Sequence, residues 1–217
     1  IYDFSARVMF NSRIAKSDFS VSSFFTSGYG NSVSYVSSKG KYVENETKTL
    51  NLRESLRLQY RADNLELMAG GDVNYKNAWY SVSSIDDIAT WTNSIRGSVN
   101  WTFLKNFNIS SDIRYTFYRG YSAGYGDAQT IWNASISKSF LHDAFTFKAA
   151  VYDMLDNAKS TYRTTTENYV QDVSNNTLGR YVMFTLTYRF GKFGGQGGMR
   201  MGGGPSGFGG PGGGMHH

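Results

Sequence analysis

Residues 181–190, Tyr-Val-Met-Phe-Thr-Leu-Thr-Tyr-Arg-Phe, alternate in side-chain character along their whole length. One set of alternate positions is entirely apolar and consists of Val182, Phe184, Leu186, Tyr188 and Phe190. The other set consists of Met183, Thr185, Thr187 and Arg189. Because successive side chains of a β-strand point to opposite faces, this period of two predicts a strand with one apolar and one more polar face.

The same period runs through the preceding part of the chain. It is clearest in residues 65–75, 95–103 and 107–118, and no segment shows a comparable helical period. The alternation predicts an all-β chain of about nine strands. These strands are expected at residues 3–14, 18–37, 47–61, 64–82, 91–104, 106–120, 128–140, 144–157 and 177–190.

The predicted connections alternate in length. Short ones are expected near residues 15–17, 62–63, 105 and 141–143, and longer ones near 38–46, 83–90, 121–127 and 158–176. Short turns at one end and longer loops at the other are typical of an outer-membrane barrel, whose short turns are periplasmic.

Three features favour a membrane barrel over a soluble β-sandwich or a small ligand-binding barrel. Several predicted strands reach about 14–20 residues, whereas strands of soluble proteins usually have about 5–6. The connections lack the proline and glycine density of sandwiches, since both prolines are Pro205 and Pro211. Aromatic residues gather at strand ends, where a barrel leaves the hydrocarbon layer. The predicted fold is an antiparallel up-and-down transmembrane β-barrel in contact with lipid in the outer membrane of a Gram-negative cell.

Composition excludes several other functions. The chain has no cysteine, and its 22 Lys and Arg against 17 Asp and Glu give a net charge of +5 that is small and scattered. A nucleic-acid partner is therefore not expected. His142 is the one histidine outside the tail and falls at a predicted periplasmic turn, away from lumenal acids. We expect no enzyme, no cofactor and no metal site.

The polar face of the strands would line a water-filled lumen. Pairing residues 91–104 with 106–120 around Lys105 places Phe103 opposite Phe107, Ser98 opposite Asp112 and Arg96 opposite Arg114. Two like charges then face each other, and Asp112 is a diagonal neighbour that could bridge them. Arg96, Asp112 and Arg114 are the lumenal candidates, either as a charge network that braces the wall or as a patch that contacts cargo or a plug.

The strand count itself carries an expectation. Bacterial single-chain barrels have even strand numbers and no free edges, so nine strands would not close one. We expect residues 1–190 to be part of a larger barrel whose other strands precede residue 1. The Gly- and Met-rich residues 191–217 form an expected disordered tail, because they cannot bury enough apolar surface.

Four segments near the C-terminus carry a family resemblance. They are residues 152–157 (YDMLDN), 163–169 (RTTTENY), 176–181 (NTLGRY) and 186–190 (LTYRF). Together with the tail, they resemble the C-terminal end of the TonB-dependent-receptor-like outer-membrane β-barrel family of Bacteroidetes. The resemblance covers residues 1–193 in pattern and is specific in residues 145–193.

The resemblance implies a barrel of about 22 strands closed by an N-terminal plug, often preceded by a carboxypeptidase-regulatory-like domain. Such receptors take up large or scarce nutrients, driven by the TonB complex of the inner membrane, and a surface lipoprotein is a further expected partner. The plug and the TonB-contacting box would lie N-terminal to residue 1. The alternative function is a barrel without active transport, either a passive porin or an anchor for surface assembly.

The last predicted strand has a second implied role. Leu186, Tyr188 and Phe190 resemble the C-terminal signal that the barrel-assembly machinery reads during insertion. They are also explained as ordinary lipid-facing side chains, and both descriptions can hold at once.

Overall fold

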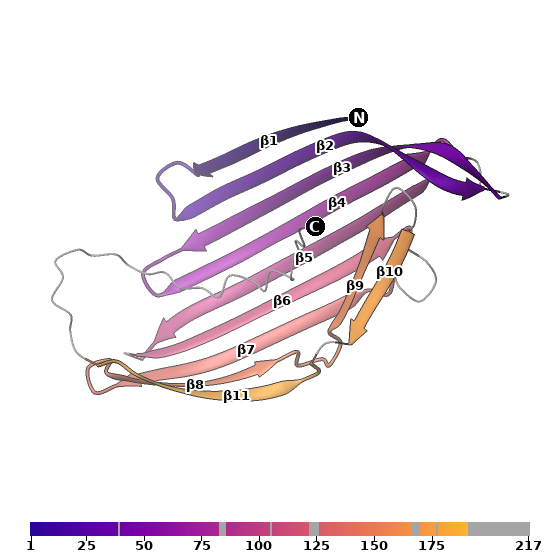
Figure 1. Ribbon diagram of the computed structural model, residues 1–217. Helices are drawn as coiled ribbons and strands as arrows, with labels where there is room; N and C mark the ends of the chain where they lie inside the picture. Colours follow the sequence, from indigo (N-terminus) through magenta and orange to yellow (C-terminus); the bar gives the residue numbers. More distant parts are fainter. Residues whose placement is uncertain are drawn as a thin grey trace.

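The computed structural model describes residues 1–38, 40–82, 86–104, 106–121, 126–165, 170–176 and 178–190. These residues form one large antiparallel sheet and a separate two-stranded hairpin (Figure 1). The strands are β1 (Tyr2–Arg13), β2 (Phe19–Ser38), β3 (Lys41–Arg61), β4 (Leu65–Tyr80), β5 (Ile88–Phe103), β6 (Phe107–Arg119), β7 (Gln129–Phe140), β8 (Phe145–Tyr152), β9 (Lys159–Thr165), β10 (Val170–Asn176) and β11 (Tyr181–Tyr188). None of the described residues forms a helix that is long and apolar enough to span a membrane.

The large sheet follows chain order. In the described residues it has nine strands in the order β1-β2-β3-β4-β5-β6-β7-β8-β11, and every pairing is antiparallel. This confirms the predicted all-β, up-and-down arrangement and its strand number. Strands β1 and β11 each have a single strand neighbour in this part of the chain, so the sheet is open (Figure 1). The predicted tail, residues 191–217, lies outside the described residues.

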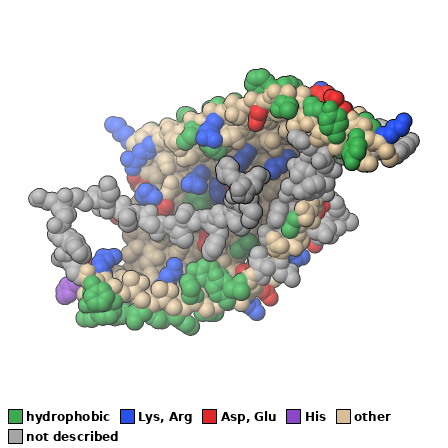
Figure 2. Space-filling model, viewed as in Figure 1, with side chains coloured by type: hydrophobic (Ala, Val, Ile, Leu, Met, Phe, Trp, Pro, Cys, Tyr) green, Lys and Arg blue, Asp and Glu red, His purple; other side chains and the backbone are tan. Residues whose placement is uncertain are grey.

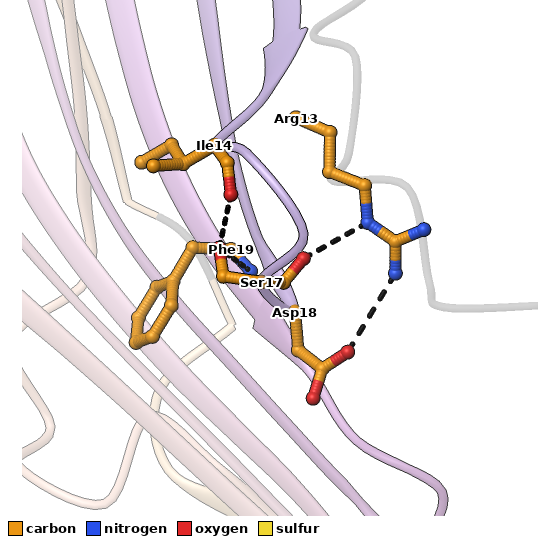
Figure 3. Close-up of polar contacts among 5 residues, drawn as sticks. All are labelled: Arg13, Ile14, Ser17, Asp18 and Phe19. Carbon is orange, nitrogen blue, oxygen red and sulfur yellow. Dashed lines mark hydrogen bonds and ion pairs between the residues drawn. The ribbon is translucent and has the colours of Figure 1, made fainter.

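Short turns connect the strands at one end of the sheet, which we call the short-turn end. The turn between β1 and β2 is fastened by its own side chains (Figure 3). The Ser17 hydroxyl donates to the Ile14 carbonyl and accepts from the Phe19 amide at 3.3 Å. Arg13 Nε donates to the Ser17 carbonyl at 3.0 Å, and its Nη2 lies 3.6 Å from an Asp18 carboxylate oxygen. A turn held in this way fixes the pairing register of the strands that it joins.

Strand β3 begins at Lys41 and is longer than the strand predicted at residues 47–61, whereas β2 has the length predicted for residues 18–37. They pair without interruption from Phe19–Tyr60 to Ser38–Lys41, so the long loop predicted at residues 38–46 is wrong. With 20 and 21 residues at about 3.4 Å each, these strands reach roughly 70 Å. Figure 1 shows their hairpin extending past the neighbouring strands.

The connection predicted as a long loop at residues 158–176 contains a second hairpin. Strands β9 and β10 pair from Lys159–Asn176 to Thr165–Val170 and form their own two-stranded sheet. Their sequences, KSTYRTT and VQDVSNN, lack a continuous apolar face. A search for apolar alternation therefore passes over them, although backbone pairing needs no apolar face.

The two faces of the large sheet differ in chemistry. Cross-strand partners share a face, and one face carries most of the large apolar side chains, such as Val8, Leu56, Ile95, Ile113 and Leu186. The side chains of these five residues are 45–66% exposed. The buried hydrophobic residues of the described part are Ala78 and Ala150. We call this apolar face the outer face. A sheet that leaves its apolar side uncovered is suited to lipid.

The opposite, inner face is concave and polar. Figure 2 shows Lys and Arg side chains gathered within the concavity, with hydrophobic side chains mainly at its margins. At the short-turn end, aromatic rings form contacts from strand to strand, including Phe103 with Phe107 at 5.7 Å and Phe145 with Tyr188 at 4.4 Å between ring centroids. These rings match the aromatic girdle predicted at strand ends.

Candidate functional site

The inner face of the sheet is the candidate functional site, because it concentrates charge. Where strands β3 to β8 have neighbours on both sides, cations outnumber acids on this face. The cations are Arg53, Arg57, Arg61, Lys76, Arg96, Arg114 and Lys148, and the acids are Glu66, Asp72 and Asp112. Arg61 and Glu66 form an ion pair of 3.0 Å near the short-turn end, so the excess positive charge lies further inside.

Three arginines share one cross-strand row. Arg57 is opposite Gly70, Gly70 is opposite Arg96, and Arg96 is opposite Arg114. We call Arg57, Arg96 and Arg114 the arginine row. The predicted pairings Arg96–Arg114, Ser98–Asp112 and Phe103–Phe107 are confirmed. Like charges directly opposite each other destabilise a sheet unless a counter-charge lies near.

The counter-charge for Arg96 comes from β4. Arg96 Nη2 lies 3.4 Å from Asp72 Oδ1 and donates to Ser55 Oγ at 3.3 Å. Ser94 Oγ holds the other carboxylate oxygen of Asp72 at 3.0 Å. The Arg96 and Asp72 side chains are 17% and 21% exposed, so this ion pair is shielded more than the surface pairs of the molecule. It crosslinks β3, β4 and β5 on the inner face.

Gly70 makes room for this ion pair. It lies between Arg57 and Arg96 in the register, and a Cβ atom there would lie 3.3 Å from Arg96 Nε and 2.8 Å from the Leu56 carbonyl oxygen. The missing side chain lets the Arg96 guanidinium cross β4 toward Ser55. This close approach explains why the strand carries glycine at a position on the charged face.

Asp112 has a different partner from the one expected. Asn133 Nδ2 donates to Asp112 Oδ2 at 2.9 Å, and the described residues show no ion pair between Asp112 and either Arg96 or Arg114. The predicted bridge is therefore wrong, and of the arginine row only Arg96 has an ion-pair partner in the described part. Asn133 also accepts the Asp153 amide at 2.9 Å, so it connects the inner wall with the end of β8.

The segment 152–157 forms a compact turn that ends β8. Asp153 is buried and has a φ of 48°, and its carboxylate accepts the amides of Asn157 at 3.0 Å and Ala158 at 2.8 Å. Asp156 accepts the amide of Arg180 at 2.9 Å. Two of the segments quoted for the family resemblance thus meet at the point where the chain leaves β8 and returns into β11.

The three residues of the expected insertion signal lie on the outer face of β11 and just after it. Leu186 is opposite Phe147, and Tyr188 is opposite Phe145. Phe190 packs edge-on against Tyr188 with ring centroids 4.2 Å apart. All three are exposed, Phe190 at 79%. Their recognition by the assembly machinery stays a prediction.

Sequence reasoning missed Asp72, Gly70 and Asn133 as partners of the charged residues. The alternation already assigned Asp72 to the polar face, but the long connection between β4 and β5 left their register undetermined. Pairing Asp72 with Ser94 would have brought it diagonal to Arg96. The described residues contain no group of three or more His, Cys, Asp or Glu side chains arranged to hold a metal ion.

Replacing Asp72 by asparagine is expected to lower the free energy of unfolding of the full-length protein by about 1–2 kcal/mol. Hydrogen bonds to charged groups contribute about 1.5–3 kcal/mol, and partial exposure to water reduces that figure. Urea unfolding in detergent micelles, followed by tryptophan fluorescence, measures the change.

A double-mutant cycle identifies the partner of Arg96. Asp72→Asn and Arg96→Gln should couple by about 1 kcal/mol, whereas Asp112→Asn and Arg96→Gln should be additive. Equal coupling energies for the two acids would contradict the observed pairing.

Comparison with known proteins gives the family of this wall. The model of a family described as outer membrane protein beta-barrel family matches residues 43–188, which are 146 of the 217 residues and run from β3 to the end of β11. Searches of the curated proteins and of the solved structures find no match. The chain therefore belongs to the outer membrane protein beta-barrel family, and its sheet is the wall of a barrel in the outer membrane.

Proposed function

We propose that this chain is the C-terminal barrel wall of a TonB-dependent-receptor-like transporter, which takes up a large or scarce nutrient across the outer membrane. The observation that carries the proposal is the arginine row on the concave, polar inner face. Charged side chains that face water suit a wide barrel that a plug domain fills and through which polar cargo passes. Arg57 and Arg114 lack an ion-pair partner in the described part, so these side chains are available to bind the plug or the cargo.

The open edges of the sheet support a larger barrel. Unpaired N–H and C=O groups in lipid cost several kcal/mol each, so both β1 and β11 need strand partners there. A transporter barrel of about 22 strands supplies these partners, whereas nine strands are an odd number for a closed single-chain barrel. The meeting of residues 152–157 with Arg180 adds support, because these segments resemble the same family and act together in the fold.

The proposed partners follow from this assignment. The TonB complex of the inner membrane would act through regions N-terminal to this wall, and a surface lipoprotein would bind at the end with the longer connections. The barrel-assembly machinery would insert the protein. Catalysis, cofactors and nucleic acids are not part of the proposal.

The second candidate function is a barrel without active transport, either a passive porin or an anchor for surface assembly. The same polar, cation-lined inner face favours it, since porins also have water-filled interiors. The difference between the two candidates is the state of the lumen, which is plugged in one and open in the other.

A conductance measurement separates the two. The full-length protein, placed in planar lipid bilayers, is expected to show no steady current, and the isolated periplasmic domain of TonB should bind it in a pull-down. A plugged lumen blocks ions, whereas an open lumen conducts them without any partner. Steady open-channel current together with the absence of TonB binding would contradict active transport and favour the porin. A closed lumen without TonB binding would favour the anchor.

A further inference from the structure

The outer face has a hollow of about 490 Å³ over the middle strands of the sheet. It lies on β4, β5 and β6, and its outer-face lining consists of Gly71, Val73, Trp91, Asn93, Ile95, Phe117 and Arg119. Gly71 is opposite Leu56 on one side and Ile95 on the other, so its missing side chain leaves the gap in an otherwise bulky apolar surface. All three strands have neighbours on both sides, so no further barrel strand can cover this hollow.

The hollow lies near one boundary of the hydrocarbon layer. Trp91 and Phe103 are both on the outer face of β5, twelve residues apart. At about 3.3 Å per residue and a tilt of about 40°, they are separated by roughly 30 Å along the membrane normal, close to the height of the apolar band of a barrel. Phe103 belongs to the aromatic contacts at the short-turn end. Trp91, whose ring packs against Tyr75 with centroids 4.4 Å apart, marks the opposite boundary.

Two polar side chains of the hollow lack a partner. Arg119 is opposite Trp91 at this boundary, is exposed, and has no ion pair or hydrogen bond among the described residues. Asn93 lies one step deeper, opposite Val73 and Phe117, and its amide likewise makes no hydrogen bond in the described part of the chain. An amide that faces lipid without a hydrogen-bond partner, as Asn93 does, is unfavourable unless a ligand satisfies it, whereas a cation at the boundary, such as Arg119, lies at the depth of lipid headgroups.

We propose that this hollow binds a phosphorylated lipid of the outer leaflet, of the lipid A type. One acyl chain fills the space over Gly71 between Val73, Ile95 and Phe117. The phosphate binds the Arg119 guanidinium, whose planar donors match phosphate oxygens. The amide of Asn93 binds the ester or amide linkage between the chain and the headgroup.

The order of the side chains along the hollow favours this occupant. Cation, amide and apolar surface follow one another from the membrane boundary inward, as phosphate, linkage and acyl chain do in a lipid. Arg119 ends β6 at the side of the longer connections, which outer-membrane barrels direct outside the cell. The outer leaflet on that side consists of phosphorylated glycolipid. This site is independent of the proposed transport, because it requires only a barrel in the outer membrane.

The test is lipid binding by the full-length protein in detergent micelles, measured by native mass spectrometry. The probes are lipid A carrying its phosphate and the same lipid A without it, with inorganic phosphate as a competitor. The wild type should bind the phosphorylated probe about tenfold more tightly than the dephosphorylated one. Inorganic phosphate should not displace it, because phosphate alone does not fill the hollow.

Two variants test the two halves of the site. Arg119→Gln should abolish the preference for phosphorylated lipid while leaving the binding of dephosphorylated lipid unchanged. Gly71→Leu should lower the affinity for both probes about tenfold, because the leucine side chain fills the hollow. A Cβ at Gly71 would lie 3.5 Å from the Ser94 carbonyl oxygen, which is an ordinary contact, so the strand accommodates it.

Matched controls come from the same face. Gly97, where a Cβ would lie 3.8 Å from its nearest neighbour, is an outer-face glycine outside the hollow, and Gly97→Leu should bind as the wild type does. Lys138, near the short-turn end, supplies the control for charge through Lys138→Gln. Equal affinity of the wild type for both probes would overturn the proposal. An equal loss in Gly71→Leu and Gly97→Leu, or in Arg119→Gln and Lys138→Gln, would overturn it as well.

Discussion

Replacing both Tyr188 and Phe190 by alanine is expected to lower the amount of assembled barrel in the outer membrane several-fold. Tyr188 stacks on Phe145 at 4.4 Å and Phe190 packs against Tyr188 at 4.2 Å, so the double variant removes both ring contacts. Each aromatic contact contributes about 0.5–1.5 kcal/mol beyond its buried area. Losses of about 1–2 kcal/mol already change cellular abundance several-fold. If these residues also form the insertion signal, assembly itself slows.

The measurement is heat-modifiable migration of outer-membrane protein on unboiled gels, together with total abundance. The matched control is Val182→Ala with Phe184→Ala, which removes apolar side chains from the outer face at the other end of the same strand. The control removes one aromatic contact, between Phe184 and Phe147 with ring centroids 6.0 Å apart, whereas the test variant removes two closer ones, so the loss in the control should be smaller. A control as deficient as the test variant would mean that the aromatic end has no special role in insertion. Unchanged assembly of both variants would also contradict a stabilising role for the ring contacts of Tyr188 and Phe190.

The large sheet was predictable because each of its strands carries the alternation of a surface between lipid and water. The pairing of β5 with β6 was predictable to the residue, from Phe103–Phe107 to Arg96–Arg114, since the connection between them is too short to permit another register. Location in the outer membrane followed from the same strands, whose length and aromatic ends have no counterpart in a small soluble sandwich.

The parts of the fold that the sequence did not predict lack this alternation of apolar and polar side chains or depend on contacts between strands. The start of β3, from Lys41 to Glu46, and the hairpin of β9 and β10 pair with their neighbours without one continuous apolar face. The ion pair of Arg96 with Asp72 depends on the register across a long connection, which the sequence pattern leaves open. Alternation therefore identifies the face on which a charge lies but does not identify its partner on the next strand.

Replacing Gly70 by alanine is expected to destabilise the barrel by about 1–3 kcal/mol, which is the usual effect of forcing an extra group into a packed site. The new Cβ would lie 2.8 Å from the Leu56 carbonyl oxygen, a backbone atom that cannot rotate away. It would also lie 3.3 Å from Arg96 Nε and press on the guanidinium, which crosses β4 at this glycine toward Ser55 and pairs with Asp72. Either β3 and β4 separate locally or Arg96 gives up its ion pair, and both outcomes weaken the inner wall.

The neighbouring glycine provides the control. Gly71 is on the outer face, where a Cβ would meet only the Ser94 carbonyl oxygen at 3.5 Å. Gly71→Ala should therefore leave stability unchanged or raise it by about 0.4–1 kcal/mol, because alanine reduces the conformational entropy of the unfolded chain. Urea midpoints of the full-length protein in micelles compare the two variants directly. A loss of stability in Gly70→Ala without a loss in Gly71→Ala would show that the inner face, and not the strand as a whole, requires glycine at residue 70. Equal destabilisation by the two alanines would instead assign the effect to the backbone of β4 and contradict a special role for the Arg96 crossing.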